Sequence, residues 1–280
     1  MRVIESCAEC LYDKQKHLSD DPAYLDEVKQ ILADRRPRDT APYLVYLFTQ
    51  AYERRFGKKA PFRAIKQTYN DLVLSMEDAI REKIASASDP LATALACARV
   101  GNYIDFGAMN SVEESVFLAL FDSAELSEQD RVTYRSFLRQ CERARTFLLI
   151  ADNCGEIVLD KLFLQQLKQT YPQLDMTVMV RGDEVLNDAT EEDARYVQLD
   201  RVASVISNGS SIAGTVYELL PHNAKEVFDR ADVILAKGQG NYESICGQGH
   251  HVFYSFLCKC ELFTNRFQVP KLTGMFLEES

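Results

Sequence analysis

The feature that most constrains the fold is a change of pattern near residue 145, where short apolar runs begin to alternate with helical stretches. The apolar runs predict strands at 145–151, 175–182, 202–209, 231–238, 252–260 and 273–279. The stretches between them predict helices at 156–172, 191–200 and 223–230, with one more between the last two strands. Strand, helix and strand in repetition predict an α/β fold with a mainly parallel, Rossmann-like sheet flanked by helices.

The first half of the chain shows only helical patterns. Apolar residues recur at helical spacing in 42–56, 71–85, 88–102 and 127–144. Asp89 and Pro90 fit the cap and first position of a helix, and Ser127 with Asp130 has capping-box spacing. We therefore predict a helical domain at 1–140 that contributes to a shared pocket, and an α/β metal-binding catalytic domain at 141–280.

Composition and charge exclude several classes of protein. With 280 residues, 46% of them hydrophobic, the chain can bury a sizeable core without disulfides. A net charge of −10 argues against general binding to nucleic acid or anionic membranes. No run approaches the roughly 18 apolar residues of a membrane span, and Glu5 and Glu9 interrupt any secretory apolar core. We expect a cytoplasmic protein whose eight cysteines are reduced thiols.

Polar side chains gather where the predicted strands end. Asp152 and Asn153 follow the first strand, and Asp188 lies in the loop after the second. In an open α/β sheet, ligands bind beyond the carboxyl ends of the strands. Carboxylate and amide oxygens suit Mg²⁺ or Mn²⁺. The sequence therefore predicts a divalent-metal site made by Asp152, Asn153 and Asp188.

The loops after the third and fourth strands are rich in glycine and small polar residues. Lys237, followed by Gly238 and Gly240, could meet an anion through its ammonium and nearby backbone amides. Ser210, Gly238 and Asn241 in these loops are further candidates for substrate binding. A metal beside a phosphate-sized anion indicates metal-assisted phosphoryl chemistry.

Structural explanations exist for several of these residues. Asn153 and Glu156 have capping-box spacing, which would leave Asp152 as an ordinary loop carboxylate. Asp193, behind Thr190, is predicted to cap a helix rather than to bind metal. Cys7 and Cys10 have metal-site spacing but lack two further ligands at useful spacing, so a helical core pair or an accessory site is the expectation.

Four segments in this order and spacing resemble the DUF89 family of ARMT1-like damage-control phosphatases. They are "DNCGEIVLD", "LNDATEEDA", "SNGSSIAGT" and "KGQGNYES". The segment "GNYIDFGA" at 101–108 adds to the resemblance, and the Cys7–Cys10 pair is similar to the CxxC of its prokaryotic-type subfamily.

The resemblance implies a metal-dependent phosphatase acting on phosphorylated small metabolites, such as sugar phosphates or damaged intermediates. It implies that Asp152, Asn153 and Asp188 hold the metal, which could be Mg²⁺, Mn²⁺, Co²⁺ or Ni²⁺, and that Lys237 contacts phosphate. It also implies that Asn102 and Asp105 reach the same pocket from the helical half. Cys154 departs from the small residue usual in the family, and a thiol there could make the site sensitive to oxidation.

The expected reaction is hydrolysis of a phosphomonoester. Lys237 and loop amides would offset charge on the phosphoryl oxygens, and Asp152 or Asp105 could take a proton. Cys154 stands where a strand-end DxD phosphatase has its second acid, which disfavours an aspartyl-phosphate route without excluding it. A protein carboxyl methyltransferase using S-adenosylmethionine and a non-enzymatic nucleotide or metal sensor are the alternatives. The expected partner is a small phosphorylated metabolite, not nucleic acid or membrane.

Overall fold

The computed structural model describes residues 1, 3–58, 61–104 and 114–279. Within these residues a six-stranded sheet has the order β3-β2-β1-β4-β5-β6. Neighbouring strands are parallel except for the pair β5 and β6, which is antiparallel. The strands are β1 (Thr146–Ile150), β2 (Asp175–Val180), β3 (Ser204–Ser207), β4 (Val233–Lys237), β5 (Val252–Leu257) and β6 (Gly274–Glu279). The predicted α/β class and mainly parallel sheet are confirmed.

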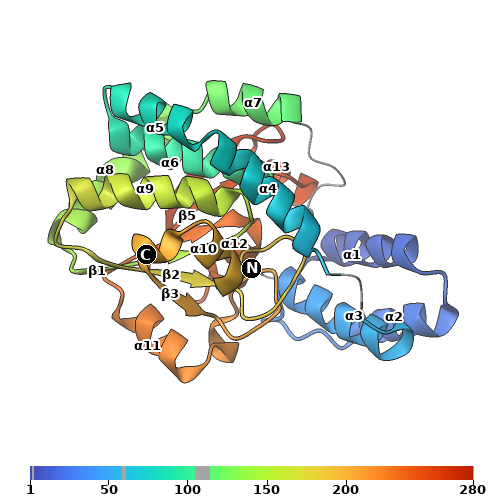
Figure 1. Ribbon diagram of the computed structural model, residues 1–280. Coiled ribbons are helices and arrows are strands. Elements are labelled where there is room, and N and C mark those ends of the chain that lie inside the picture. Colours follow the sequence, from blue (N-terminus) through green and yellow to red (C-terminus); the bar gives the residue numbers. More distant parts are fainter. Residues whose placement is uncertain (2, 59–60, 105–113, 280) are drawn as a thin grey trace.

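Helices precede the sheet in the chain and then alternate with its strands (Figure 1). Before β1 lie α1 (Glu5–Leu18), α2 (Pro22–Ala33), α3 (Ala41–Phe56), α4 (Arg63–Ser75), α5 (Glu77–Ser86), α6 (Pro90–Val100), α7 (Glu114–Asp122) and α8 (Glu128–Arg143). Between and after the strands lie α9 (Glu156–Thr170), α10 (Glu191–Tyr196), α11 (His222–Arg230), α12 (Gly238–Ile245) and α13 (Glu261–Phe267).

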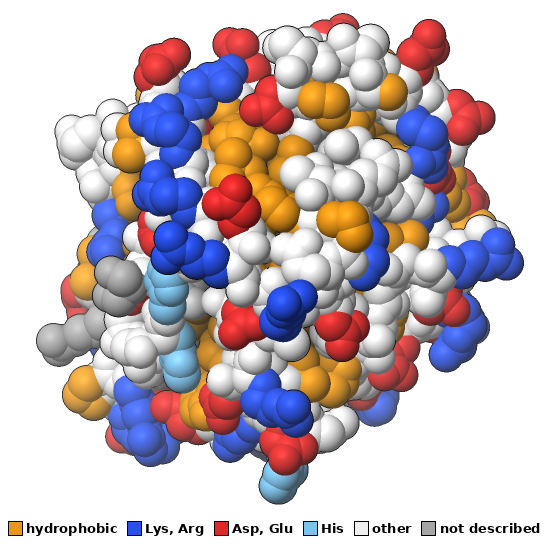
Figure 2. All heavy atoms as spheres, turned by 90° about the vertical axis from the view of Figure 1, so that its left-hand side faces the viewer, with side chains coloured by type: hydrophobic (Ala, Val, Ile, Leu, Met, Phe, Trp, Pro, Cys, Tyr) orange, Lys and Arg blue, Asp and Glu red, His pale blue; other side chains and the backbone are white. Residues whose placement is uncertain are grey.

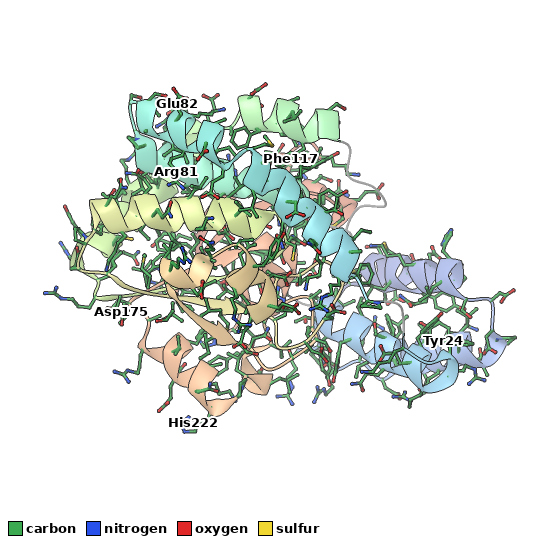
Figure 3. All side chains as sticks on the ribbon, viewed as in Figure 1. Tyr24, Arg81, Glu82, Phe117, Asp175 and His222 are labelled. Carbon is green, nitrogen blue, oxygen red and sulfur yellow. The ribbon has the colours of Figure 1, made fainter. Side chains whose placement is uncertain are left out.

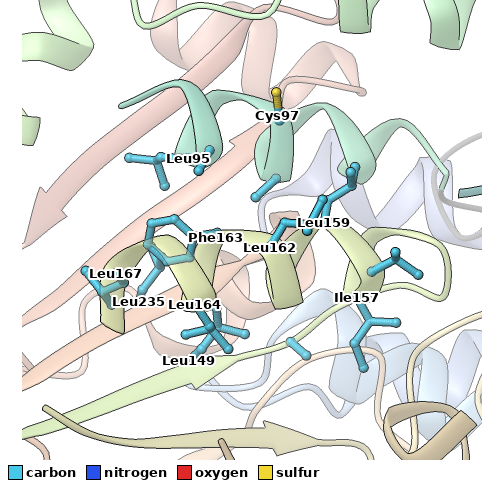
Figure 4. Close-up of a cluster of buried hydrophobic side chains, with 14 of the residues drawn as sticks. Leu95, Cys97, Leu149, Ile157, Leu159, Leu162, Phe163, Leu164, Leu167 and Leu235 are labelled. Atoms are coloured by element: carbon cyan, nitrogen blue, oxygen red, sulfur yellow. The ribbon is translucent and has the colours of Figure 1, made fainter. Parts of the chain in front are cut away.

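Side chains alternate across the sheet and bury it on both faces. Phe147 and Leu149 of β1 face a core that includes α6 and α9, whereas Leu148 and Ile150 face a second core that includes α11, α12 and α13. Figure 4 shows the first of these cores, with Leu149 packed beneath α9. Burial on both faces explains why the strands appear in the sequence as continuous apolar runs.

A third, smaller core holds α1, α2 and α3 together beside the main body. Tyr24, Leu44 and Phe48 are fully buried in it. Figure 3 shows Tyr24 at the opposite end of the molecule from Asp175, the first residue of β2. The main core includes residues from both halves of the chain, such as Leu95 and Phe163. The predicted domain boundary near residue 140 stays a prediction.

Several predicted caps are present, and two predicted helices are divided. The helix predicted at 191–200 becomes α10 and a 3₁₀ turn at Leu199–Arg201. Asp89 accepts from the Ala92 backbone N–H at 3.0 Å, and Ser127 forms its capping box with Asp130. The predicted helix at 71–85 is instead split at Met76, where α4 ends and α5 begins. Both helices bury an apolar face, so the helical period continues across the break and does not reveal it.

Figure 2 shows the end of the molecule where the strands begin, with basic side chains in a column along one side and acidic side chains scattered across the rest. A surface hollow of about 470 Å³ lies here, lined by Arg139, Arg143 and Asp232 among others. The predicted metal ligands Asp152, Asn153 and Asp188 lie at the opposite, carboxyl end of the strands. None of the described helices has the length and apolar character needed to cross a bilayer.

Candidate metal and phosphate site

The candidate site lies where the chain reverses its direction of travel across the sheet. From β1 the chain runs outward through β2 to β3, and it then returns to the other side of β1 to form β4 and β5. Such a switch point opens a crevice at the carboxyl ends of the two central strands. Asp152 follows β1 and Gly238 follows β4, which brings both residues to this point.

Gly238 packs directly against the carboxylate of Asp152. Its φ is +79°, and a Cβ at this position would lie 2.0 Å from Asp152 Oδ2. A side chain here would therefore collide with the carboxylate and would also strain the backbone. Glycine at this strand end is required for the Asp152 carboxylate to occupy its place.

The loop after β2 lies alongside the loop after β1 and brings the three predicted metal ligands together. Asn153 and Asp188 form an isolated antiparallel bridge. The Ala189 backbone N–H donates to Asp152 O at 2.7 Å, and the Cys154 N–H donates to Asn187 O at 2.8 Å. These bonds place Asp152, Asn153 and Asp188 on adjacent stretches of backbone, although the sequence separates Asp188 from the others by some 35 residues.

Arg181 bridges the two carboxylates of the site. Its Nε donates to Asp188 Oδ2 at 2.7 Å, and its Nη2 donates to Asp152 Oδ1 at 3.3 Å. Its Nη1 donates to Asn241 Oδ1 at 3.2 Å and to Thr215 Oγ1 at 3.3 Å. The guanidinium is buried. Asp152 and Asp188 therefore lie within the span of one guanidinium group.

Two asparagine amides fix the second oxygen of Asp152. Asn102 Nδ2 donates to Asp152 Oδ2 at 2.9 Å, and Asn153 Nδ2 donates to the same oxygen at 2.7 Å. Asn102 lies in a 3₁₀ turn directly after α6, and its Oδ1 accepts from the Leu257 backbone N–H at 3.1 Å. The structure thus places Asn102, from the helical half, beside Asp152, and its role in substrate binding, which the resemblance implied, stays a prediction.

Lys237 does not have the geometry predicted for a phosphate contact. Its Nζ donates to Glu156 Oε1 at 2.7 Å, Asp160 Oδ1 at 2.6 Å and Ala98 O at 3.0 Å, and the side chain is fully buried. Three acceptors use the three ammonium donors. The reason is strand alternation: Lys237 points to the same face as Leu235, into the layer of α6 and α9. The assignment of Lys237 as a phosphate contact is therefore corrected to a buried ion-pair role.

The remaining predicted residues have different surroundings. Asn241 is buried, donating to Ala151 O and Lys237 O while accepting from Arg181, so it binds other parts of the protein. Ser210 lies beside the loop that follows β2, where its carbonyl accepts from the Gly182 N–H at 2.9 Å. Asp105 lies outside the described residues. The substrate-binding roles of Ser210, Gly238 and Asn241 stay predictions.

Cys154 is fully buried, and burial raises the pKa of its thiol well above the usual value. The thiolate is the form that reacts with oxidants, so the predicted sensitivity to oxidation is not supported.

The possible capping box of Asn153 and Glu156 is absent, because the N-cap of α9 is Gly155. Instead, Asn153 Nδ2 donates to Glu156 Oε2 at 3.1 Å. Asp193 caps α10 with Thr190, as predicted.

Sequence reasoning missed the site roles of Glu156, Asp160, Arg181 and Asn70. Arg181 follows β2 directly, so its place at a strand end was a signal that could have identified it. Glu156 was visible near a helix start, where its position suggests only a cap. Asn70 lies on α4, far along the sequence from any strand end. Its Oδ1 accepts from the Gly155 N–H at 2.7 Å. Only the packing of α4 against α9 reveals that contact.

The excess of carboxylates in the site is complementary to the charge of a divalent cation. Four buried carboxylates (Asp152, Glu156, Asp160 and Asp188) surround two buried cations, Lys237 and Arg181. Burial, which outweighs the attraction of Lys237, raises the pKa of Asp160 to about 7. The four carboxylates outnumber these two cations by two, in a buried region. A hard divalent cation bound by oxygen atoms would neutralise this excess.

Comparison with known proteins identifies the family. The family model of the damage-control phosphatase ARMT1-like domain matches residues 2–273. The chain is 28% identical to a damage-control phosphatase from Archaeoglobus fulgidus, with 93% of each chain covered. It is 30% identical to the damage-control phosphatase PH1575 from Pyrococcus horikoshii over 77% of this chain and 73% of that protein.

A solved structure supports the fold assignment. The crystal structure of a DUF89 family protein from Pyrococcus horikoshii superimposes with a TM-score of 0.81, covering 100% of both chains at 22% sequence identity. This likeness concerns the fold, and the family model matches nearly the whole chain. The chain therefore belongs to the damage-control phosphatase family of ARMT1-like domains.

Proposed function

We propose that the protein is a metal-dependent phosphatase that hydrolyses phosphomonoesters of small metabolites, such as sugar phosphates or damaged phosphometabolites. The family supports the phosphatase class. The observation that supports the metal requirement is the pair Asp152 and Asp188, two buried carboxylates from neighbouring loops held within the span of one guanidinium. Carboxylate oxygen atoms are ligands that a divalent cation such as Mg²⁺ prefers.

Asp152, Asn153 and Asp188 would hold the metal, which we propose to be Mg²⁺, Mn²⁺, Co²⁺ or Ni²⁺. When bound, such an ion polarises a phosphoryl oxygen and makes a water molecule more acidic. Asn102 and Gly238 keep the Asp152 carboxylate in place, the first by donating to it and the second by leaving room for it. Arg181 keeps the two carboxylates at a fixed separation.

We propose water, rather than an aspartate, as the nucleophile. A strand-end aspartyl-phosphate route needs a second acid two residues after Asp152, and that residue is the buried Cys154. Asp152 or Asp105 would accept the proton from the attacking water. In this proposal the protein acts in the cytoplasm on small phosphorylated molecules, and neither nucleic acid nor a membrane takes part.

The test is phosphate release by protein that has been stripped with chelator and then given Mg²⁺, Mn²⁺, Co²⁺ or Ni²⁺ singly. A generic phosphomonoester and a panel of sugar phosphates would serve as substrates. Turnover should require metal, and Asp188→Asn should lower it by more than about 100-fold because a ligand to the ion is weakened. Glu77→Gln, which removes charge from a partly buried ion pair outside the site, is the control. Full turnover without metal, or binding of S-adenosylmethionine without phosphate release, would contradict the proposal.

A further inference from the structure

A buried ionic cluster lies directly beneath the candidate site, where α6, α9 and β4 meet. Lys237 is enclosed by Glu156 and Asp160 of α9 and by the Ala98 carbonyl of α6. All three charged side chains are fully buried. Although burial lowers it, the two carboxylates hold the pKa of Lys237 above its ordinary value. Removing any of these charges from water costs free energy, so a cluster at this place calls for a functional explanation.

Glu156 connects this cluster to the site. Its Oε1 accepts from Lys237 at 2.7 Å, and its Oε2 accepts from Asn153 Nδ2 at 3.1 Å and from Asn102 Nδ2 at 3.2 Å. Both amide nitrogens also donate to Asp152 Oδ2. The two asparagine side chains are therefore each held between two carboxylates.

The chemistry of a primary amide makes this arrangement selective. The NH₂ and carbonyl ends of an asparagine side chain have nearly the same shape, but one end only donates and the other only accepts. A carboxylate can only accept, so Glu156 binds the NH₂ end. For Asn153, the NH₂ group is shared by Glu156 and Asp152, which turns Oδ1 away from both.

We propose that Glu156 is a positioning residue, with Lys237 as its counter-ion, which sets the orientation of the Asn153 and Asn102 amides and thereby the affinity of the site for a divalent cation. This inference rests on the proposed function, because it concerns the same metal site. It gives Lys237 a role that its buried geometry permits, in place of a contact with phosphate.

Glu156→Gln tests the inference because glutamine has the same shape. Lys237 can only donate, so the glutamine oxygen must face Lys237 and the glutamine NH₂ must face the two asparagines. The NH₂ group of the glutamine would then face the NH₂ group of Asn153, and two donors cannot form a hydrogen bond. The Asn153 amide would therefore turn its oxygen toward the glutamine and its NH₂ toward the metal. We expect the Kd for Mn²⁺, measured by calorimetry on folded protein, to rise by about 10- to 100-fold, as for other residues that orient metal ligands.

Two further variants separate positioning from general damage. Glu77→Gln changes the charge of a partly buried Lys–Glu pair that also involves α9, through Lys161, and should leave the Kd for Mn²⁺ unchanged. In an Asn153→Asp background either end of the side chain offers an oxygen. Adding Glu156→Gln to Asn153→Asp should therefore change the Kd by less than about threefold, and an undiminished effect would overturn the inference.

The wild-type protein provides a measurement that does not depend on a variant folding. Before metal is added, the side-chain NH₂ protons of Asn153 and Asn102, assigned by NMR with Asn153→Asp, should be protected from exchange with solvent. Rapid exchange of both groups in folded protein would overturn the inference, as would a Kd for Mn²⁺ in folded Glu156→Gln within twofold of wild type. Failure of the wild type to bind Mn²⁺ or release phosphate would instead refute the proposed function.

Discussion

Gly238, at the end of β4, packs directly against the carboxylate of Asp152, which follows β1. Alanine at this position would place its Cβ 2.0 Å from Asp152 Oδ2. We predict that Gly238→Ala abolishes Mn²⁺ binding and phosphate release, because Asp152 must move out of the site. The measurement is Mn²⁺ calorimetry alongside a thermal unfolding curve.

Gly247→Ala is the matched control for this prediction. Gly247 has φ +83°, close to that of Gly238, but no described atom lies within 4 Å of the position that an alanine methyl would take. Its substitution should cost only the backbone strain, about 1–2 kcal/mol, and should leave metal binding intact. Equal effects of the two substitutions would show that backbone strain, and not the contact with Asp152, is responsible.

The raised pKa of the buried Asp160 should make the free energy of unfolding depend on pH. Burial raises its pKa in the folded protein to about 7, whereas the unfolded value is near 3.8. Between these values the folded state holds a proton that the unfolded state has lost, so this residue's contribution to stability falls as pH rises. Asp160→Asn cannot ionise, and its NH₂ would replace Oδ2, which has no hydrogen-bond partner among the described residues.

The measurement is urea unfolding of wild type and Asp160→Asn at pH 5 and pH 8. We predict that the free energy of unfolding of the variant, relative to wild type, increases by on the order of 2 kcal/mol between the two pH values. Parallel pH profiles for the two proteins would show that Asp160 is already ionised at pH 5.

At the scale of elements, α4 connects the helical half to the site loops. Lys66 of α4 pairs with Asp193 of α10 at 2.6 Å, and both side chains are largely buried. Burial alone would raise the pKa of Asp193, but hydrogen bonds from Lys66 and Thr190 lower it below its ordinary value. The pair therefore stabilises the fold above pH 4, and this contribution is lost as pH falls through the lowered pKa.

We predict that Lys66→Met lowers the free energy of unfolding by about 3 kcal/mol at pH 7, because it leaves a buried carboxylate unpaired. The difference from wild type should shrink as pH falls, because burial without Lys66 makes Asp193 take up a proton in the variant at a higher pH than in wild type. Arg63→Met is the control, since Arg63 pairs with Glu192 between the same two helices at an exposed position. A similar loss in both variants would contradict the account.

The elements were predictable where local pattern decides them. All six strands and the caps at Asp89 and Ser127 follow from apolar runs and capping chemistry, which act between near neighbours in the chain. The strand order and the antiparallel β6 depend on contacts between distant segments, and the sequence does not specify them directly. The break at Met76 escaped prediction for a different reason, because both helices share one apolar period.

In the site, too, local sequence pattern predicted some residues, whereas others depend on contacts between distant segments. Asp152, Asn153 and Asp188 were predictable because parallel strands end at one edge of a sheet. The direction of the Lys237 side chain was not, since it depends on which face of β4 packs against α9. Arg181 and Glu156 were visible at strand and helix ends, but only the folded structure shows that each binds site residues.

At the scale of the whole molecule, the described residues form a core on each face of the sheet, the larger of them drawn from both halves of the chain, and a smaller core in α1–α3. Local opening requires less free energy where fewer apolar side chains are buried. We predict that native-state hydrogen exchange gives a lower opening free energy for amides of α2 and α3 than for those of α6 and α9. Equal opening free energies would show that the small core unfolds only together with the rest.

The central claim is that oxygen atoms from two neighbouring loops hold one divalent cation at the switch point of the sheet. Crystals grown with Mn²⁺ would test it through anomalous scattering at the manganese edge. We predict one strong peak within about 2.3 Å of oxygen atoms of Asp152, Asn153 and Asp188. A peak elsewhere, or no peak at a Mn²⁺ concentration that supports full turnover, would contradict the claim.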